Sequence, residues 1–122
     1  MELNEYQNKA MTTCMLTCKN ISYMLLNLQS EVGEFSGKIA KHIRKGEAII
    51  DANKIWFNEA ELTDEYFAVM EDLEKEAGDI LWQLAGLCKV MGWNLEDVAQ
   101  QNLAKLASRK QRGVIDGNGD NR

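Results

Sequence analysis

The stretch Lys75-Glu76-Ala77-Gly78-Asp79-Ile80-Leu81 has an earlier counterpart in Ser30-Glu31-Val32-Gly33-Glu34-Phe35. Both contain an acidic residue, a small or apolar residue, a glycine and a second acidic residue, in that order. Residues three apart on a helix lie on one face with about 5–6 Å between their Cβ atoms, so each stretch sets two carboxylates side by side. Because like charges at that spacing repel, two such pairs predict a positive partner between them, which we interpret as a divalent metal ion.

The apolar residues around the acidic pairs predict two helices that pack against each other. A period of 3.6 residues gathers these residues in one stripe on each helix. The stripes are Leu28, Val32, Phe35 and Ile39 in the first helix, and Leu73, Ala77, Ile80, Leu84 and Met91 in the second. Each acidic pair follows the same flank of its stripe, so packed stripes would bring four carboxylates together. These candidate ligands are Glu31, Glu34, Glu76 and Asp79.

An alternative is that the four acids form solvated faces, as most charged residues do. That interpretation would suffice for one acidic pair, but two matched pairs favour a metal site. A glycine also lies inside each pair, at Gly33 and Gly78. Glycine in a helix interior costs about 1 kcal/mol relative to alanine. We therefore expect these glycines to permit close approach of the helix backbones.

The composition predicts one soluble all-α domain. The chain has 122 residues, 45% of them hydrophobic and 27% charged, and it contains no proline. A length of this order supports one hydrophobic core, and alternating β-branched runs are few. Cap residues and periodicity predict helices over 4–18, 21–45, 63–91 and 94–110, with N-caps at Asn4, Thr63 and Asn94.

We therefore predict a four- to five-helix bundle in residues 1–112 and a flexible C-terminal tail in residues 113–122. The tail contains three glycines and has no helical pattern. The connection 47–62 is too apolar for a free linker, and we expect it to fold over the helices or to meet another subunit.

Charge and cysteine usage limit the partners and the compartment. The net charge of -5 argues against general nucleic-acid binding through the phosphate backbone. No apolar run approaches the roughly 20 residues of a membrane span, and the N-terminus lacks the features of a signal peptide. Three cysteines without a CxxC motif argue against a disulfide framework. We therefore expect a cytoplasmic protein that binds neither nucleic acid nor membrane.

Carboxylate ligands suit Mg²⁺, or alternatively Mn²⁺, better than zinc, which prefers histidine and cysteine. The one histidine, His42, lies at a predicted helix end, and neither acidic pair has the histidine of a ferritin-like di-iron site. An acidic Mg²⁺ site typically holds the oxygens of a phosphate chain and lowers the pKa of a bound water, for which one carboxylate can act as base. Lys38 and Lys41 follow the first acidic pair, either as compensation for the helix dipole or as phosphate contacts.

Three motifs together resemble a known family. They are Glu31-x-x-Glu34, Glu76-x-x-Asp79 and Asn102-x-x-Lys105-Leu106-x-x-Arg109-Lys110-x-Arg112-Gly113. This ordered set resembles the MazG-like all-α nucleoside triphosphate pyrophosphohydrolases, and especially their small phage- or prophage-type members. The resemblance covers most of the chain. Two departures are Ser30, where the family often carries a further glutamate, and the long segment 46–62 between the acidic pairs.

The resemblance implies hydrolysis of a (deoxy)nucleoside triphosphate to the monophosphate and pyrophosphate by metal-activated water. It implies that Mg²⁺ is bound by the four carboxylates, with nucleotide contacts from Asn102 and Lys105. Lys38, Arg109 and Lys110 are further candidates for substrate binding. It also implies a homodimer or homotetramer with active sites near the subunit interfaces. The alternatives are a non-catalytic helical module for nucleotide binding or protein interaction, and a phosphoribosyl-ATP pyrophosphohydrolase.

Overall fold

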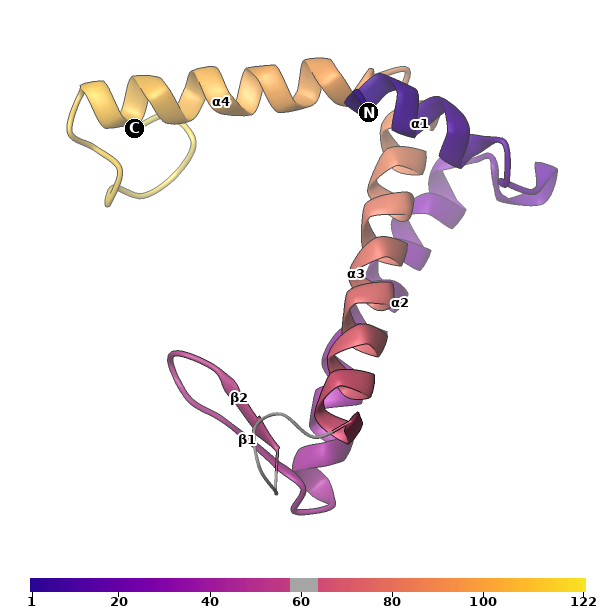
Figure 1. Ribbon diagram of the computed structural model, residues 1–122. Helices are drawn as coiled ribbons and strands as arrows, with labels where there is room; N and C mark the ends of the chain where they lie inside the picture. Colours follow the sequence, from indigo (N-terminus) through magenta and orange to yellow (C-terminus); the bar gives the residue numbers. More distant parts are fainter. Residues whose placement is uncertain (58–63) are drawn as a thin grey trace.

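A computed structural model of the protein describes residues 1–57 and 64–122 (Figure 1). The elements in chain order are α1 (Leu3–Met11), a 3-10 turn η1 (Leu16–Cys18), α2 (Ile21–Arg44), β1 (Ala48–Ile50), β2 (Ile55–Phe57), α3 (Asp64–Val90) and α4 (Leu95–Gln111). The predicted all-α class is confirmed. The N-cap expected at Thr63 lies outside the described residues. No helix in the described ranges is long and apolar enough to cross a membrane.

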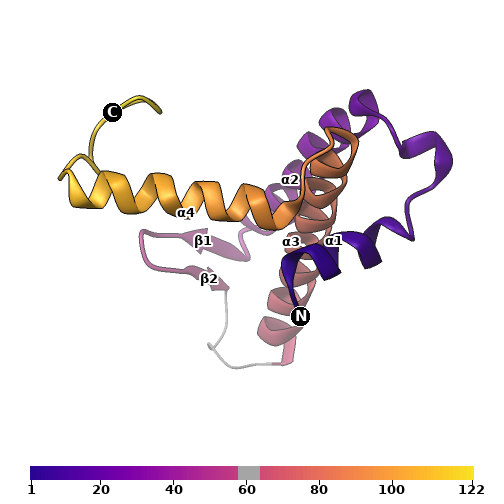
Figure 2. The same ribbon diagram turned by 90° about the horizontal axis from the view of Figure 1, so that it is seen from above.

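The central unit is an antiparallel pair of long helices, α2 and α3, which lie side by side in both views (Figures 1 and 2). The side chain of Asn20 caps the start of α2 by accepting a hydrogen bond from the Tyr23 N–H at 2.8 Å. Gly46, with a φ of 71°, ends this helix in the left-handed conformation. The chain then forms a short antiparallel hairpin in which Ala48 of β1 lies opposite Phe57 of β2. The sequence did not predict these strands.

The corner between α3 and α4 is held by the side chains of Gln7 and Asn4, both on α1. Gln7 is 2% exposed, and its Oε1 accepts a hydrogen bond from the Leu95 N–H at 3.1 Å. Its Nε2 donates to the carbonyl oxygens of Ala85 and Trp93 at 3.2 and 3.0 Å. The bond from Leu95 satisfies one of the backbone N–H groups that a helix start leaves without an intrahelical partner.

Asn4 has a different role from the one predicted. The N-cap residue of α1 is Glu2, and the Oδ1 of Asn4 instead accepts a hydrogen bond from the Glu96 N–H in the first turn of α4, at 3.0 Å. Asn94 occupies the N-cap position of α4, but its side chain makes no capping bond. The N-terminus of α4 is therefore capped by residues from the other end of the sequence.

Helix α4 projects away from the α2–α3 pair, as both views show (Figures 1 and 2). Residues 113–122, predicted as a flexible tail, form a loop that folds back along α4 (Figure 1). The guanidinium of Arg109 holds this loop by donating to the carboxylate of Asp120 at 2.9 Å. Arg122 adds bonds to the carbonyl oxygens of Val114 and Ile115 at 3.0 and 3.3 Å.

Candidate metal centre

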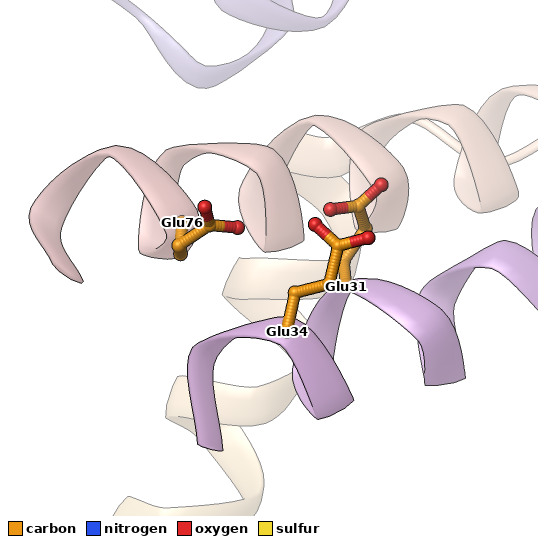
Figure 3. A group of neighbouring side chains, drawn as sticks. All are labelled: Glu31, Glu34 and Glu76. Carbon is orange, nitrogen blue, oxygen red and sulfur yellow. The ribbon is translucent and has the colours of Figure 1, made fainter. Parts of the chain in front are cut away.

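Helices α2 and α3 bring three of the four predicted carboxylates together. Glu31 and Glu34 extend from adjacent turns of α2, and Glu76 faces them from α3 (Figure 3). One carboxylate oxygen of each residue lies within 4.8 Å of the others. This convergence follows from the three-residue spacing of the acidic pair and from the antiparallel packing of the two helices.

Glu76 is the buried member of the cluster. The residue is 8% exposed, and its Oε2 is buried without a hydrogen-bond partner among the described residues. A buried carboxylate oxygen without a partner is costly, because it has lost its hydration. The donor set of three converging carboxylates fits a hard divalent cation such as Mg²⁺ or Mn²⁺.

The pKa of Glu31 is raised above its usual range, first by burial and then by the neighbouring charges of Glu34, Asp79 and Glu76. A hydrogen bond from Asn27 acts in the opposite direction and lowers the pKa. The carboxylates therefore repel one another through space, and a bound cation would relieve that repulsion.

Asp79, the fourth predicted carboxylate, is exposed on α3 and is not part of the three-residue cluster. Its charge nevertheless acts on Glu31, so it lies at the margin of the same site. The expectation for the two glycines is wrong within this chain, because a Cβ added at Gly33 or Gly78 would meet no atom within 4 Å. The close approach between α2 and α3 occurs instead at Gly86, where an added Cβ would lie 2.6 Å from the Met24 side chain.

Lys38 lies at the cluster and is already paired. Its Nζ is 2.5 Å from Oε1 of Glu76 and 2.7 Å from Oδ2 of Asp72. Hydrogen bonds to Asp72 and Glu76 raise the pKa of Lys38 above its usual range. The ammonium thus supplies part of the positive charge that the acidic pairs require.

The predicted nucleotide contacts lie on α4, away from the carboxylates of the same chain. Asn102 and Lys105 line an open pocket of about 510 Å³, together with Trp93 and five other residues. Glu76 lies 14 residues before the end of α3 at Val90, which corresponds to about 20 Å of helix. The structure therefore places the carboxylates and the α4 residues at separate positions within one chain.

Three basic residues of α4 were candidates for binding the substrate. Lys105 and Arg109 both contact Oδ1 of Asp120, at 3.2 and 2.9 Å, and Arg109 is 5% exposed. The Nε of Arg109 is buried without a hydrogen-bond partner in the described part of the chain. Lys110 is exposed on the helix surface.

Sequence reasoning missed two polar residues beside the cluster. Asn27 lies one turn before Glu31, and Gln83 lies one turn after Asp79. Asn27 Nδ2 donates to Glu31 at 2.9 Å and to Gln83 at 2.7 Å. The sequence feature that could have identified them is an amide side chain one helical turn from an acidic residue, close to an otherwise apolar stripe.

Comparisons with known proteins identify the family of this chain. The family model of the MazG nucleotide pyrophosphohydrolase domain matches residues 19–114, which include α2, α3 and α4. Gene 37 protein of Mycobacterium phage L5 is 36% identical over 104 residues, which cover 85% of this chain and 78% of that protein. No solved structure matches. Because the family model spans most of the chain, the protein belongs to the MazG nucleotide pyrophosphohydrolase family of hydrolases.

Proposed function

We propose that the protein hydrolyses a (deoxy)nucleoside triphosphate to the monophosphate and pyrophosphate in a Mg²⁺-dependent reaction. The observation that carries this proposal is the convergence of Glu31, Glu34 and Glu76, with a buried Glu76 oxygen that has no partner in the described chain. Bound Mg²⁺ supplies Lewis-acid contacts to phosphate oxygens and lowers the pKa of a coordinated water. Mn²⁺ offers the same coordination chemistry.

The protein residues have distinct tasks in this reaction. Glu31, Glu34, Glu76 and Asp79 are the candidate metal ligands, and one carboxylate accepts a proton from the attacking water. The water oxygen bonds to the α-phosphorus, the bond from that phosphorus to the bridging oxygen breaks, and pyrophosphate leaves. The ammonium of Lys38 has three N–H donors, of which Glu76 and Asp72 use two. We assign the third donor to a phosphate oxygen of the substrate.

The substrate contacts from α4 require a second copy of the chain. Lys105 lies ten residues into α4, about 15 Å beyond the corner, and the corner is itself about 20 Å from Glu76. Asn102, Lys105, Arg109 and Lys110 of one protomer therefore serve the carboxylates of another protomer in this proposal. A homodimer is the simplest such assembly, and a homotetramer of two dimers preserves the arrangement.

Exposed apolar side chains provide the surface for this assembly. On α2, Leu25 and Leu26 are 49% and 75% exposed, and on α4, Leu103 and Leu106 are 60% and 42% exposed. Contiguous apolar residues on helix surfaces typically mark interfaces in soluble proteins. Burial between copies would bring α4 of one protomer toward the α2–α3 pair of another.

Pyrophosphate release from a panel of nucleoside triphosphates, with Mg²⁺ or with EDTA, tests the reaction. We expect metal-dependent release, and its loss in Glu34→Gln and in Asp79→Asn with the fold retained. Glu74→Gln is the matched control, because Glu74 is an exposed acid on α3 outside the cluster. Full turnover of both site variants at saturating Mg²⁺ would refute the site. A folded protein that releases no pyrophosphate would favour the non-catalytic module. Release from phosphoribosyl-ATP alone would favour a phosphoribosyl-ATP pyrophosphohydrolase.

Mixed oligomers test the contribution of the second copy. Glu34→Gln and Lys105→Ala are each expected to be inactive alone. If the site joins two protomers, a mixed dimer keeps one site without either substitution. Random mixing in equal amounts would then restore about a quarter of the wild-type activity. If each site forms within one chain, every site stays defective and the mixture shows no recovery.

A further inference from the structure

A chain of hydrogen bonds connects the buried interface of α2 and α3 to the metal centre. Asn27 Nδ2 donates to Oε1 of Glu31 at 2.9 Å and to Oε1 of Gln83 at 2.7 Å. Asn27 and Glu31 belong to α2, whereas Gln83 belongs to α3. One amide group therefore links a candidate metal ligand to the facing helix.

The buried environment of Gln83 determines which groups donate and which accept in this series of hydrogen bonds. Gln83 is 0% exposed, and its Nε2 faces the carbonyl oxygen of Met24 at 3.4 Å and the Met24 sulfur at 3.0 Å. Both of those atoms are acceptors, so the amide nitrogen of Gln83 must point toward Met24 and its oxygen toward Asn27. Asn27 in turn must present its own nitrogen to Gln83, and the second N–H on that nitrogen reaches Glu31.

Met24 is itself held in place by packing. It is 0% exposed, and its Sδ and Cε lie against Gly86, where an added Cβ would be 2.6 Å from each atom. Because Met24 is fully buried and packs directly against Gly86, its side chain is confined by the close-packed core. The orientation of the Gln83 amide is thus determined by the rigid core, and that orientation extends through Asn27 to the carboxylate.

We propose that Asn27 and Gln83 are positioning residues of the metal centre, which fix the rotamer and plane of the Glu31 carboxylate for a divalent cation. The proposal rests on the proposed function, because it assumes that Glu31 is a ligand. A hydrogen bond to one carboxylate oxygen leaves lone pairs on both oxygens for coordination. Partners of this kind orient ligands before the metal arrives, and their loss commonly weakens metal binding by about 10- to 100-fold.

Calorimetric titration of the nucleotide-free protein with Mg²⁺ and with Mn²⁺ provides the test. We expect Asn27→Ala and Gln83→Met to bind the metal about 10- to 100-fold more weakly than the wild type. Gln83→Met keeps a side chain of similar volume, which limits the disturbance of the core. Gln29→Ala is the matched control, because Gln29 is an exposed amide on the same helix. We expect it to bind metal like the wild type.

The double variant provides a sharper criterion. Because Gln83 acts on Glu31 only through Asn27, adding Gln83→Met to Asn27→Ala is expected to cause no further loss of metal affinity. At saturating metal, kcat of the single variants is expected to return toward the wild-type value, while the half-saturating metal concentration stays raised. A purely structural role would instead lower the melting temperature in EDTA and leave the metal affinity unchanged.

The outcomes separate this proposal from the proposed function. If the wild type binds neither metal at the cluster, the metal centre itself is refuted. If the wild type binds metal and both variants bind it equally well, the positioning role is overturned and the metal centre stands. Should Gln83→Met fail to fold, Asn27→Ala alone decides, since Asn27 is only half-buried.

Discussion

The Nζ of Lys38 lies 2.5 Å from Oε1 of Glu76, so the acidic cluster contains a positive charge from its own protein. The same ammonium contacts Asp72 at 2.7 Å. Oε1 of Glu76 forms this ion pair, and Oε2 is buried without a hydrogen-bond partner in the described chain. The lysine therefore neutralises part of the cluster and leaves one ligand position for a cation.

Replacement of this lysine is expected to destabilise the metal-free protein and to strengthen the binding of metal. Lys38→Met removes the charge that balances Glu76 and Asp72, so we expect a lower melting temperature in EDTA. It also removes a positive charge that repels Mg²⁺, so we expect metal to bind several-fold more tightly. Thermal melts across a Mg²⁺ titration measure both effects.

Lys75→Met is the control for this experiment, because Lys75 pairs with Glu71, one turn away on the same helix, at 3.0 Å. This exposed pair lies outside the carboxylate cluster, and we expect little change in either measurement. Unchanged metal affinity in Lys38→Met would show that the ammonium does not compete with the cation.

The corner between α3 and α4 is expected to depend on one buried amide. Gln7→Leu leaves the Leu95 N–H and the Trp93 carbonyl oxygen without the partner that Gln7 supplies. Loss of a buried hydrogen-bond partner costs about 1–3 kcal/mol of unfolding free energy. Urea unfolding should show a lower midpoint for this variant. Asn8→Ala, an exposed amide on the same helix, should leave the midpoint nearly unchanged, and equal midpoints in all three proteins would contradict the capping role.

The contact between Gly86 and Met24 predicts different results for two glycine substitutions. Gly86→Ala places a Cβ 2.6 Å from the Met24 side chain, and we expect the resulting overpacking to cost about 1–3 kcal/mol. Gly37→Ala, on α2, meets no atom within 4 Å and should stabilise the helix by about 0.4–1 kcal/mol. Denaturant unfolding of the two variants measures this difference. A Gly86→Ala protein as stable as the wild type would show that Met24 has space to move.

The C-terminal loop is expected to depend on Asp120. Arg109 and Lys105 hold the pKa of this carboxyl below its usual range through hydrogen bonds, so the carboxylate is already charged throughout the neutral range. Its contribution to stability is therefore present above the ordinary value of 3.8 and lost as the pH falls through the lowered value. Between about pH 5 and pH 8, at constant ionic strength, we expect the contribution of Asp120 to stability to be independent of pH.

Hydrogen exchange of residues 113–122 measures the order of this loop. Asp120→Asn is expected to speed exchange several-fold, whereas Asp116→Asn, another exposed acid of the same loop, is expected to have little effect. Added salt should also speed exchange in the wild type, because Asp120 is 82% exposed and its ion pairs are screened. Slow exchange in Asp120→Asn would mean that the bonds from Arg109 to the carbonyl oxygens of Gly119 and Asp120, together with those of Arg122, are enough to hold the loop.

Local patterns in the sequence were sufficient for the all-α class and for the proximity of three acids. Helix periodicity assigns Glu31 and Glu34 to one face of α2 without any knowledge of the fold. The apolar stripes then predict that this face meets the helix that carries Glu76. The same patterns also select Asp79, which is exposed and is not a member of the three-residue cluster. They do so because a flank shared by several turns does not specify which residue points inward.

The sequence by itself determined the helical elements and the faces on which their charged and apolar residues lie, because these features depend on neighbours within a few positions. Only the tertiary structure decided the partners of Gln7, Asn27, Gln83 and Lys38, the outward direction of α4 and the folding back of the C-terminal loop. The hydrogen bond from the Leu95 N–H to Oε1 of Gln7 joins residues that are 88 positions apart. Such contacts depend on how whole helices pack against one another. The local spacing of residues does not specify which distant parts of the sequence meet.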